Sequence, residues 1–220
     1  MPMVTTSASS DLEPRSAKGR RTRANLIKAA KEVFERDGFL NARIADISET
    51  AGLSHGSFYH YFDSKEQVFR ELANAQEVSV LEMHKPGEHS PPDQAPIDRI
   101  REGNRHYLEA YKREAKLMRV IEEVSRYDDE VLAVRMQRQQ EFAQKLQASI
   151  VRLQKEGIAD KSIDPHYAAN ALGGMVAKFA EMWFGQNGRY SMDKAVDQLT
   201  LLWANALGLP PAKATTKRRR

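Results

Sequence analysis

Apolar side chains recur at three- and four-residue spacing along most of the chain, which is the period of an amphipathic α-helix. The first such segment covers 22–37, and its apolar face holds Leu26, Ile27, Ala30, Val33 and Phe34. Gly38 follows as a natural stop, because glycine tolerates the left-handed backbone that often ends a helix. The chain has no convincing run of alternating apolar and polar residues, so it predicts an all-α fold.

A tight turn separates the second and third predicted helices. The second covers 43–50, and Gly52 after it suits a turn that needs positive φ. The third starts at Ser54, whose hydroxyl is expected to accept the backbone N–H near Ser57. Two short helices joined by such a turn and packed on a first helix form the helix-turn-helix arrangement, whose second helix enters the major groove of DNA.

Longer amphipathic helices are predicted for the rest of the chain. Asp63 and Glu66 have capping-box spacing, so a fourth helix is expected from Ser64 to beyond Leu81. Prolines then predict a loop over about 85–95. After this loop, helices are expected over 96–113, 115–127, 129–156, 164–185 and 192–207.

The stretch 52–66, GLSHGSFYHYFDSKE, combines core and surface requirements. Phe58 and Phe62 lie one helical turn apart and are expected to face a small core. Gly56 costs about 1 kcal/mol relative to alanine inside a helix, a cost that fits a backbone that must lie close to another surface. Lys65 opposes the helix dipole in the first turn, so it is either a phosphate contact or a solvated side chain.

Composition narrows the class of protein. With 220 residues the chain can bury a real core as one large domain or as a small and a larger one. It contains no cysteine, which excludes disulfides and cysteine metal sites. No apolar run reaches the roughly 18 residues of a membrane span, and the N-terminus lacks the apolar middle of a signal peptide. We expect a cytoplasmic, nucleoid-associated protein with no membrane partner.

The formal charge of +4 is concentrated at the two ends of the chain. Residues 15–23 hold five lysines or arginines, and 213–220 hold five more, so the body carries more acidic than basic groups. Basic arms suit a polyanion, since each neutralised phosphate releases counterions. The alternative, charge that only keeps a tail soluble, stays open, above all for the C-terminal run. The first 17 residues are rich in Ser, Thr and Pro and are expected to be disordered.

The segment 24–69 resembles the N-terminal domain of the tetracycline-repressor (TetR) family, whose pattern is roughly AA..LF...G...TT...IA..AGVS.GT.Y.YF.SKE.L. The residues in register are Ala29, Ala30, Phe34, Gly38, Ile47, Ala51, Gly52, Ser54, Gly56, Tyr59, Tyr61, Phe62, Ser64, Lys65 and Glu66. The resemblance implies a helix-turn-helix domain over 18–72, a helical effector-binding and dimerisation domain over 73–209 and tails at 1–17 and 210–220.

The same resemblance implies a DNA surface. Base contacts are expected from His55 and Gly56, with Ala45 and His60 as further candidates, and phosphate contacts from Ser57, Tyr59, Tyr61 and Lys65. The family usually has a threonine pair before the second helix, where this chain has Ala42 and Arg43. Arg43 is therefore a candidate charged contact, and Asn41 a candidate helix cap.

The last two predicted helices carry apolar and small residues around most of their circumference. A helix that is apolar on nearly all sides needs more than one partner surface, and small residues let helices approach closely. They are expected to form a homodimer interface, although a purely internal core would use the same residues. The candidates are Ala168, Ala171, Gly173, Gly174, Leu199, Leu202 and Trp203.

A small-molecule pocket in the larger domain is the family's other implied feature. Aromatic, aliphatic and methionine side chains can line an adaptable apolar cavity, and each is also an ordinary core residue. The candidates are Tyr107, Leu117, Met118, Ile121, Phe142, Met175, Phe179 and Trp183. No cluster of inward charges is evident, which favours a hydrophobic or acyl-type effector.

Catalysis and metal binding find little support in the sequence. There is no nucleophile-elbow or paired-acid pattern, and His84 and His89 in a loop make a poor metal site. Asp164 is better interpreted as a helix cap, with Pro165 at the first helical position. We therefore expect a non-enzymatic, cofactor-free, ligand-responsive repressor. Its expected partners are a palindromic double-stranded DNA operator, a second copy of the chain and a small effector; the alternative is an effector-independent or protein-controlled DNA-binding protein.

Overall fold

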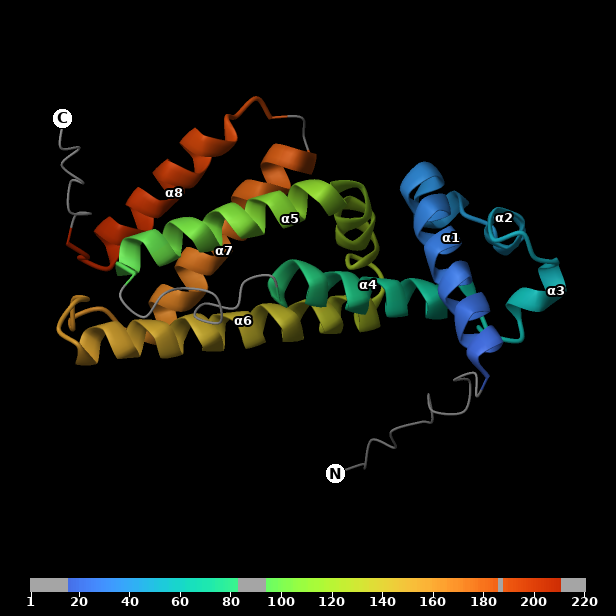
Figure 1. Cartoon of the computed structure of the whole chain (residues 1–220), viewed down its shortest axis with the longest axis horizontal. Coiled ribbons are helices and arrows are strands. Elements are labelled where there is room, and N and C mark those ends of the chain that lie inside the picture. Colours follow the sequence, from blue (N-terminus) through green and yellow to red (C-terminus); the bar gives the residue numbers. More distant parts are fainter. Residues whose placement is uncertain (1–15, 83–93, 186–187, 211–220) are drawn as a thin grey trace, which may run out of the picture. The chain divides into compact units, whose positions relative to one another are not determined.

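The computed structural model describes residues 16–82, 94–185 and 188–210, and the side chains of these residues except 76–82. Within these ranges the chain forms eight α-helices and no strand (Figure 1). The all-α prediction is confirmed. The first unit comprises the described residues up to Ala75 together with Val120–Val131, and the second unit comprises Gln76–Arg119 and the residues from Leu132 onward.

Helix α1 (Ala17–Asn41) begins earlier than the sequence pattern predicts. Its cap is Ser16, whose hydroxyl accepts the backbone N–H of Gly19 at 3.0 Å. Because the cap lies this far upstream, Ser16 and Ala17 belong to the helix start and not to the predicted tail, whose residues 1–15 lie outside the described ranges. Gly38 has φ 74° and interrupts the helix where the stop was predicted, although one further turn follows it.

Helices α2 (Ile44–Thr50) and α3 (His55–Phe58) form the predicted helix-turn-helix. The turn contains Gly52 at φ 68°. The side-chain amide of Asn25 on α1 donates to the carbonyl of Ala51 at 2.8 Å, so the first helix holds the turn directly. Figure 1 shows α2 and α3 beside α1 within the first unit.

Two of the predicted caps in this unit are wrong. The Ser54 hydroxyl contacts the Ser57 hydroxyl at 2.8 Å, and the Ser57 N–H donates instead to the Ser54 carbonyl at 2.9 Å. Asn41 lies inside α1 and donates to the carbonyl of Asp37 at 3.2 Å, because a short amide reaches the carbonyl one turn back more easily than the next helix. Helix α2 therefore follows Arg43 without a side-chain cap.

Helix α4 (Lys65–Glu82) is capped one residue later than predicted. The Ser64 hydroxyl accepts the N–H of Gln67 at 3.1 Å, and the Gln67 side chain accepts the N–H of Asp63 at 2.5 Å. This reciprocal pair satisfies two backbone donors, as a capping box does. Glu66, the predicted partner, has no part in it because Ser64 is the residue that starts the helix.

The second unit contains most of the long helices. Asp164 caps one of them as predicted, since its carboxylate accepts the N–H of His166 at 2.8 Å. The predicted break near residue 114 is wrong: Arg113, Glu114 and Ala115 all favour helix and no Gly or Pro interrupts them. The predicted loop at 85–95 lies largely outside the described residues. The helices are α5 (Pro96–Val124), α6 (Asp129–Lys155), α7 (Pro165–Gly185) and α8 (Met192–Ala206).

Aromatic rings form the core of the first unit. Phe34 is fully buried, 5.1 Å from the Phe69 ring and 5.7 Å from the Phe39 ring, measured between centroids. Phe58 and Phe62 are also fully buried, with centroids 5.6 Å apart, and face inward as predicted. Burial of each such ring stabilises the fold by about 1.5–3 kcal/mol. The short α3 is held by these two rings and not by its own length.

Candidate nucleic-acid interface

The first turn of α3 presents polar groups to solvent. His55, Gly56 and His60 are exposed, and Tyr59 is 50% exposed. The His55 and Tyr59 rings stand edge to face at 5.5 Å, so each helps to orient the other. With Phe58 buried on the opposite side, imidazole nitrogens and a phenol hydroxyl point outward from a fixed backbone. Such groups donate and accept hydrogen bonds at base edges and phosphates.

The remaining predicted DNA-contact residues surround this turn. Ser57 and Tyr61 are partly exposed, while Arg43 and Ala45 are exposed at the start of α2. Among the described residues Arg43 has no ion pair or side-chain hydrogen bond, so its charge is available to another molecule. These four residues and the α3 surface belong to the same compact unit.

Lys65 has a different role from the predicted phosphate contact. Its ammonium group donates to the carbonyls of Phe39 at 2.8 Å, Ala42 at 3.0 Å and Leu40 at 3.3 Å. It also lies 4.7 Å from the centre of the Phe39 ring. These carbonyls end α1, and a cation stabilises the negative end of a helix dipole. The prediction is corrected for this reason: all three donors of Lys65 are used inside the protein.

The basic run at the start of α1 divides in a similar way. Lys18, Arg20 and Arg21 are exposed on the first turns of the helix. Arg23 instead pairs with Glu71 on α4 at 2.5 Å and lies 4.8 Å above the Phe62 ring. Local sequence patterns do not indicate this difference, because the partner of Arg23 is 48 residues away.

A polar contact missed by the sequence analysis joins α4 to the start of α6. Arg70 pairs with Asp128 at 3.0 Å and with Glu130 at 2.7 Å. Asp128 also caps α6, accepting the N–H groups of Glu130 and Val131 at 3.0 Å. Partial burial by itself raises the pKa of Asp128, but the Val131 N–H and Arg70 outweigh it and the pKa lies below the usual value. No sequence signal could have paired residues 58 positions apart.

None of the predicted pocket residues lines the cleft that is described below. Leu117, Met118 and Ile121 are buried on α5. Ile121 belongs to the first unit, whereas Leu117 and Met118 belong to the second. Tyr107 is buried with its ring 6.1 Å from that of Tyr111.

The α7 members of the predicted pocket set pack largely on aromatic neighbours. The Phe179 and Trp183 rings lie 5.8 Å apart and both contact Tyr190. Met175 is half-buried on α7, and Phe142 is half-buried on α6. These contacts show how the residues pack, and their role in a pocket stays a prediction.

The predicted dimer residues split into two sets. Ala168, Leu199 and Trp203 are buried within a single chain. A Cβ on Gly173 would lie 3.2 Å from Leu146, so this glycine permits close packing onto α6. Assigning Ala168, Leu199 and Trp203 to a partner surface is therefore corrected, because their own unit covers them. Gly173 is half-buried, and its role in a dimer stays a prediction.

The other predicted dimer residues are exposed, and other exposed apolar residues lie on the same helices. Ala171 and Gly174 are exposed on α7, and Leu202 is 52% exposed on α8. The sequence analysis missed Tyr167, which is 74% exposed, and Leu201, which is 48% exposed. On α7 the exposed set recurs at helical spacing and forms one stripe: Tyr167, Ala171, Gly174, Lys178 and Met182.

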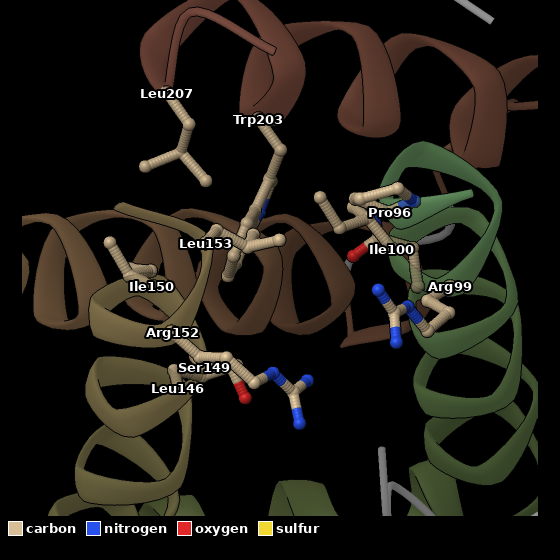
Figure 2. A pocket seen from close by; sticks show the side chains of 11 residues that line it. Pro96, Arg99, Ile100, Leu146, Ser149, Ile150, Arg152, Leu153, Trp203 and Leu207 are labelled. Carbon is tan, nitrogen blue, oxygen red and sulfur yellow. The ribbon is translucent and has the colours of Figure 1, made fainter. Parts of the chain in front are cut away.

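A cleft in the second unit lies between the start of α5, the end of α6 and α8 (Figure 2). It encloses about 610 Å³ of space, including its open mouth. Its apolar lining comprises Pro96, Ile100, Leu146, Ile150, Leu153, Trp203 and Leu207, and its polar lining Arg99, Asn104, Ser149 and Arg152. Of these residues the sequence analysis named only Trp203, and for a different role.

In the described part of the chain, no helix is both long and apolar enough to cross a bilayer. No cluster of three or more potential metal-ligating side chains occurs there either.

A three-helix head with an exposed polar first turn on its last helix defines a helix-turn-helix DNA-binding regulator. Residues 26–72 match the family of bacterial regulatory proteins called the tetR family, and residues 93–207 match the tetracyclin repressor-like C-terminal domain. The chain belongs to the TetR family of transcriptional regulators.

Relatives by sequence match this chain most closely over short stretches. The helix-turn-helix-type regulator YdgC of Bacillus subtilis is 45% identical over 56 residues, 26% of this chain and 29% of that protein. The transcriptional repressor NicS of Pseudomonas putida is 41% identical over 68 residues, 31% of this chain and 28% of that protein. The matches thus span under a third of these two relatives. A probable acrEF/envCD operon repressor of Escherichia coli K12 is 22% identical over 188 residues, 83% of this chain and 85% of that protein.

Solved structures share the fold at low identity. The fatty acid degradation regulator FadR of Bacillus halodurans superposes with a TM-score of 0.72 at 16% identity, covering 90% of this chain and all of that one. The FadR of Bacillus subtilis, solved in complex with stearoyl-CoA, gives a TM-score of 0.69 at 16% identity, covering 82% and 96% of the two chains. At these identities the likeness establishes the fold.

Proposed function

We propose that this protein is a homodimeric repressor that leaves a palindromic DNA operator when a small, largely hydrophobic effector binds. The observation that carries the proposal is the first turn of α3. His55, Gly56 and Tyr59 are exposed on it, while Phe58 and Phe62 are fully buried and fix its backbone. The exposed groups contribute nothing to a folding core, whereas a DNA-binding surface requires such groups. A regulator of this kind works in the cytoplasm on the nucleoid.

The proposed DNA contacts follow from exposure. His55 and Gly56 read base edges, with Ala45 and His60 beside them. Phosphates are held by Ser57, Tyr59, Tyr61 and Arg43, which are exposed or partly exposed. Lys18 and Arg21 at the start of α1 add positive charge that a phosphate backbone attracts. Lys65 is left out because its donors are already bound to carbonyls.

The proposed dimer uses the exposed faces of α7 and α8. Tyr167 and Leu202 expose large apolar side chains there, and Gly174 gives the α7 stripe a point of close approach. A two-fold dimer brings two recognition helices to half-sites about one helical turn, or about 34–36 Å, apart. Replacing Leu202 with Glu should shift the protein from dimer to monomer in light scattering. The exposed Gln198, one turn earlier, replaced with Glu is a milder control.

The proposed effector acts by shifting a population. It must bind the DNA-incompetent state more tightly than the competent one, and DNA must weaken effector binding by the same factor. The similarity in fold to the FadR that was solved with stearoyl-CoA supports the proposal of a lipid-like effector.

The decisive experiment measures DNA reading at His55. Once an operator is selected from random DNA by the purified protein, His55→Ala should weaken operator binding by about 1–3 kcal/mol and leave scrambled DNA nearly unaffected. Fluorescence anisotropy at one fixed salt concentration measures both. His106→Ala, which is exposed on α5 of the second unit, is the matched control. Equal losses on both DNAs would remove the base-reading role.

A further inference from the structure

The cleft of the second unit combines an apolar lining with two positive side chains at its mouth. Arg99 comes from the first turns of α5 and Arg152 from the last turn of α6. Figure 2 shows both guanidinium groups extending into the space between these helices. Among the described residues, no carboxylate lines the cleft. The acids nearest Arg99 along α5 are bound elsewhere: Asp98 pairs with Arg101 at 2.8 Å, and Glu102 accepts from Gln94 at 3.3 Å.

Helix-end electrostatics explains one of these arginines and not the other. Arg152 near a helix C-terminus complements the dipole, so it needs no ligand. Arg99 near a helix N-terminus opposes the dipole, which costs a few tenths of a kcal/mol. Within the described residues neither guanidinium has an ion pair. A bound anion would offset this cost at Arg99.

Trp203 supplies an independent observation. Its side chain extends from α8 into the cleft region in Figure 2 and is only 7% exposed. Its indole N–H is buried and has no acceptor among the described residues. An unsatisfied buried donor costs about 1–3 kcal/mol, and buried polar groups are normally paired. The neighbouring Asn104 donates instead to Thr200 at 3.2 Å.

We propose that this cleft binds an amphipathic anion, with a carboxylate or phosphate group between Arg99 and Arg152. Its apolar body lies along Ile100, Ile150 and Leu153, and an acceptor atom reaches the Trp203 N–H. The biological role of this anion as the effector rests on the proposed function. Binding of the anion to the cleft is measured without DNA.

Trp203 itself provides the readout. The chain has two tryptophans, so Trp183→Phe leaves Trp203 as the single fluorophore. Sodium decanoate and decyl phosphate represent the two head groups, and decan-1-ol is the neutral control of equal chain length. Both anions should change the emission saturably and bind at least about tenfold more tightly than decan-1-ol, about 1.4 kcal/mol. The stronger anion identifies the head group. Calorimetry on the unsubstituted protein repeats the ranking if Trp183→Phe disturbs folding.

Substitutions then locate the site. Arg99→Gln with Arg152→Gln should reduce anion affinity at least about tenfold and leave decan-1-ol binding unchanged. Ser149→Phe, which fills the cleft, should abolish binding of all three probes, whereas Gln144→Phe, exposed on the same helix and outside the cleft, should not. Equal binding of alcohol and anions, or full anion binding by either cleft variant, overturns the proposal.

Operator binding separates this inference from the proposed function. If the anions bind the cleft but never release operator DNA, the binding site stands and its role as the effector site fails. If some effector releases the operator equally well from the Ser149→Phe variant, repression stands and the cleft is not its effector site.

Discussion

The two units of the protein expose opposite kinds of residue. In the first unit the exposed surface of α3 carries histidines and Tyr59 over a fully buried aromatic pair. In the second unit the exposed faces of α7 and α8 carry Tyr167, Met182, Leu201 and Leu202. A surface that meets DNA must present hydrogen-bonding groups, whereas a surface that meets another protein copy gains most from apolar area.

Sequence identity to relatives differs with the length that is matched. Identity is 45% over 56 residues with one relative, but 22% over the 188 residues shared with the Escherichia coli repressor. A helical domain that keeps its hydrophobic pattern and its packing volume tolerates many apolar substitutions.

The largest expected effect comes from breaking the core of the first unit. Phe34→Ala should destabilise it by about 3–5 kcal/mol, because the ring is fully buried between two others. Both tryptophans belong to the second unit. In urea, the circular dichroism transition should therefore gain an early phase while the tryptophan fluorescence midpoint stays in place. Equal shifts in both signals would mean that the two units unfold together.

Lys65→Met is expected to have the next largest effect, and it separates a structural lysine from a DNA-binding one. Losing three hydrogen bonds from a charged donor should destabilise the first unit by about 1.5–3 kcal/mol. The salt dependence of DNA binding should stay the same, because no phosphate contact is lost. Arg43→Met is the matched variant: it should leave stability nearly unchanged and reduce the salt slope by about 1. A reduced slope for Lys65→Met would restore the phosphate role.

The pH dependence of stability tests the polar contact that Asp128 makes in the first unit. Asp128→Ala removes the α6 cap and the Arg70 pair and should cost about 0.5–2 kcal/mol at pH 7. Asp128→Asn keeps a capping oxygen and should cost less. Because the folded-state pKa lies below the ordinary 3.8, the ion-pair contribution is complete above that value and is lost as pH falls through the folded pKa. Urea unfolding should show the wild type and Asn variant converging in strong acid.

The smallest effects on stability are expected at two exposed glycines, one in each unit. A Cβ on Gly56 or Gly174 would meet nothing within 4 Å, and neither has positive φ. Alanine at either site should leave stability unchanged or raise it by up to about 1 kcal/mol. Gly56→Ala should nevertheless weaken operator binding, and Gly174→Ala should weaken dimerisation, in anisotropy and sedimentation respectively. If both functions survive, neither glycine lies close to a partner surface.

Local features were predictable because their causes lie within a few residues. The inward turn of Phe58 and Phe62, the positive φ of Gly38 and Gly52 and the Asp164 cap all follow from spacing and residue type. Predictions failed where a side chain could form a hydrogen bond with either of two local partners. Asn41 bonds one turn back, not forward, and no local rule ranks these two choices.

Long-range partners decided the rest. Gly173 was predicted to be a dimer contact, but Leu146 of the same chain lies beside it. The cleft is formed by helices far apart in the sequence, and none of the predicted pocket residues lines it. Apolar periodicity identifies which face of a helix is buried, but not which helix or partner covers it.

The sequence by itself determined the all-α class, the helix-turn-helix and the outward polar surface of α3, because helix period, turn chemistry and a shared motif are local properties of the chain. Only the tertiary structure showed that Lys65 holds the end of α1, that Arg70 holds Asp128, and that Arg99 and Arg152 face one cleft. A charged side chain has many possible partners along a sequence, and the folded chain decides which of them lies within a few ångströms.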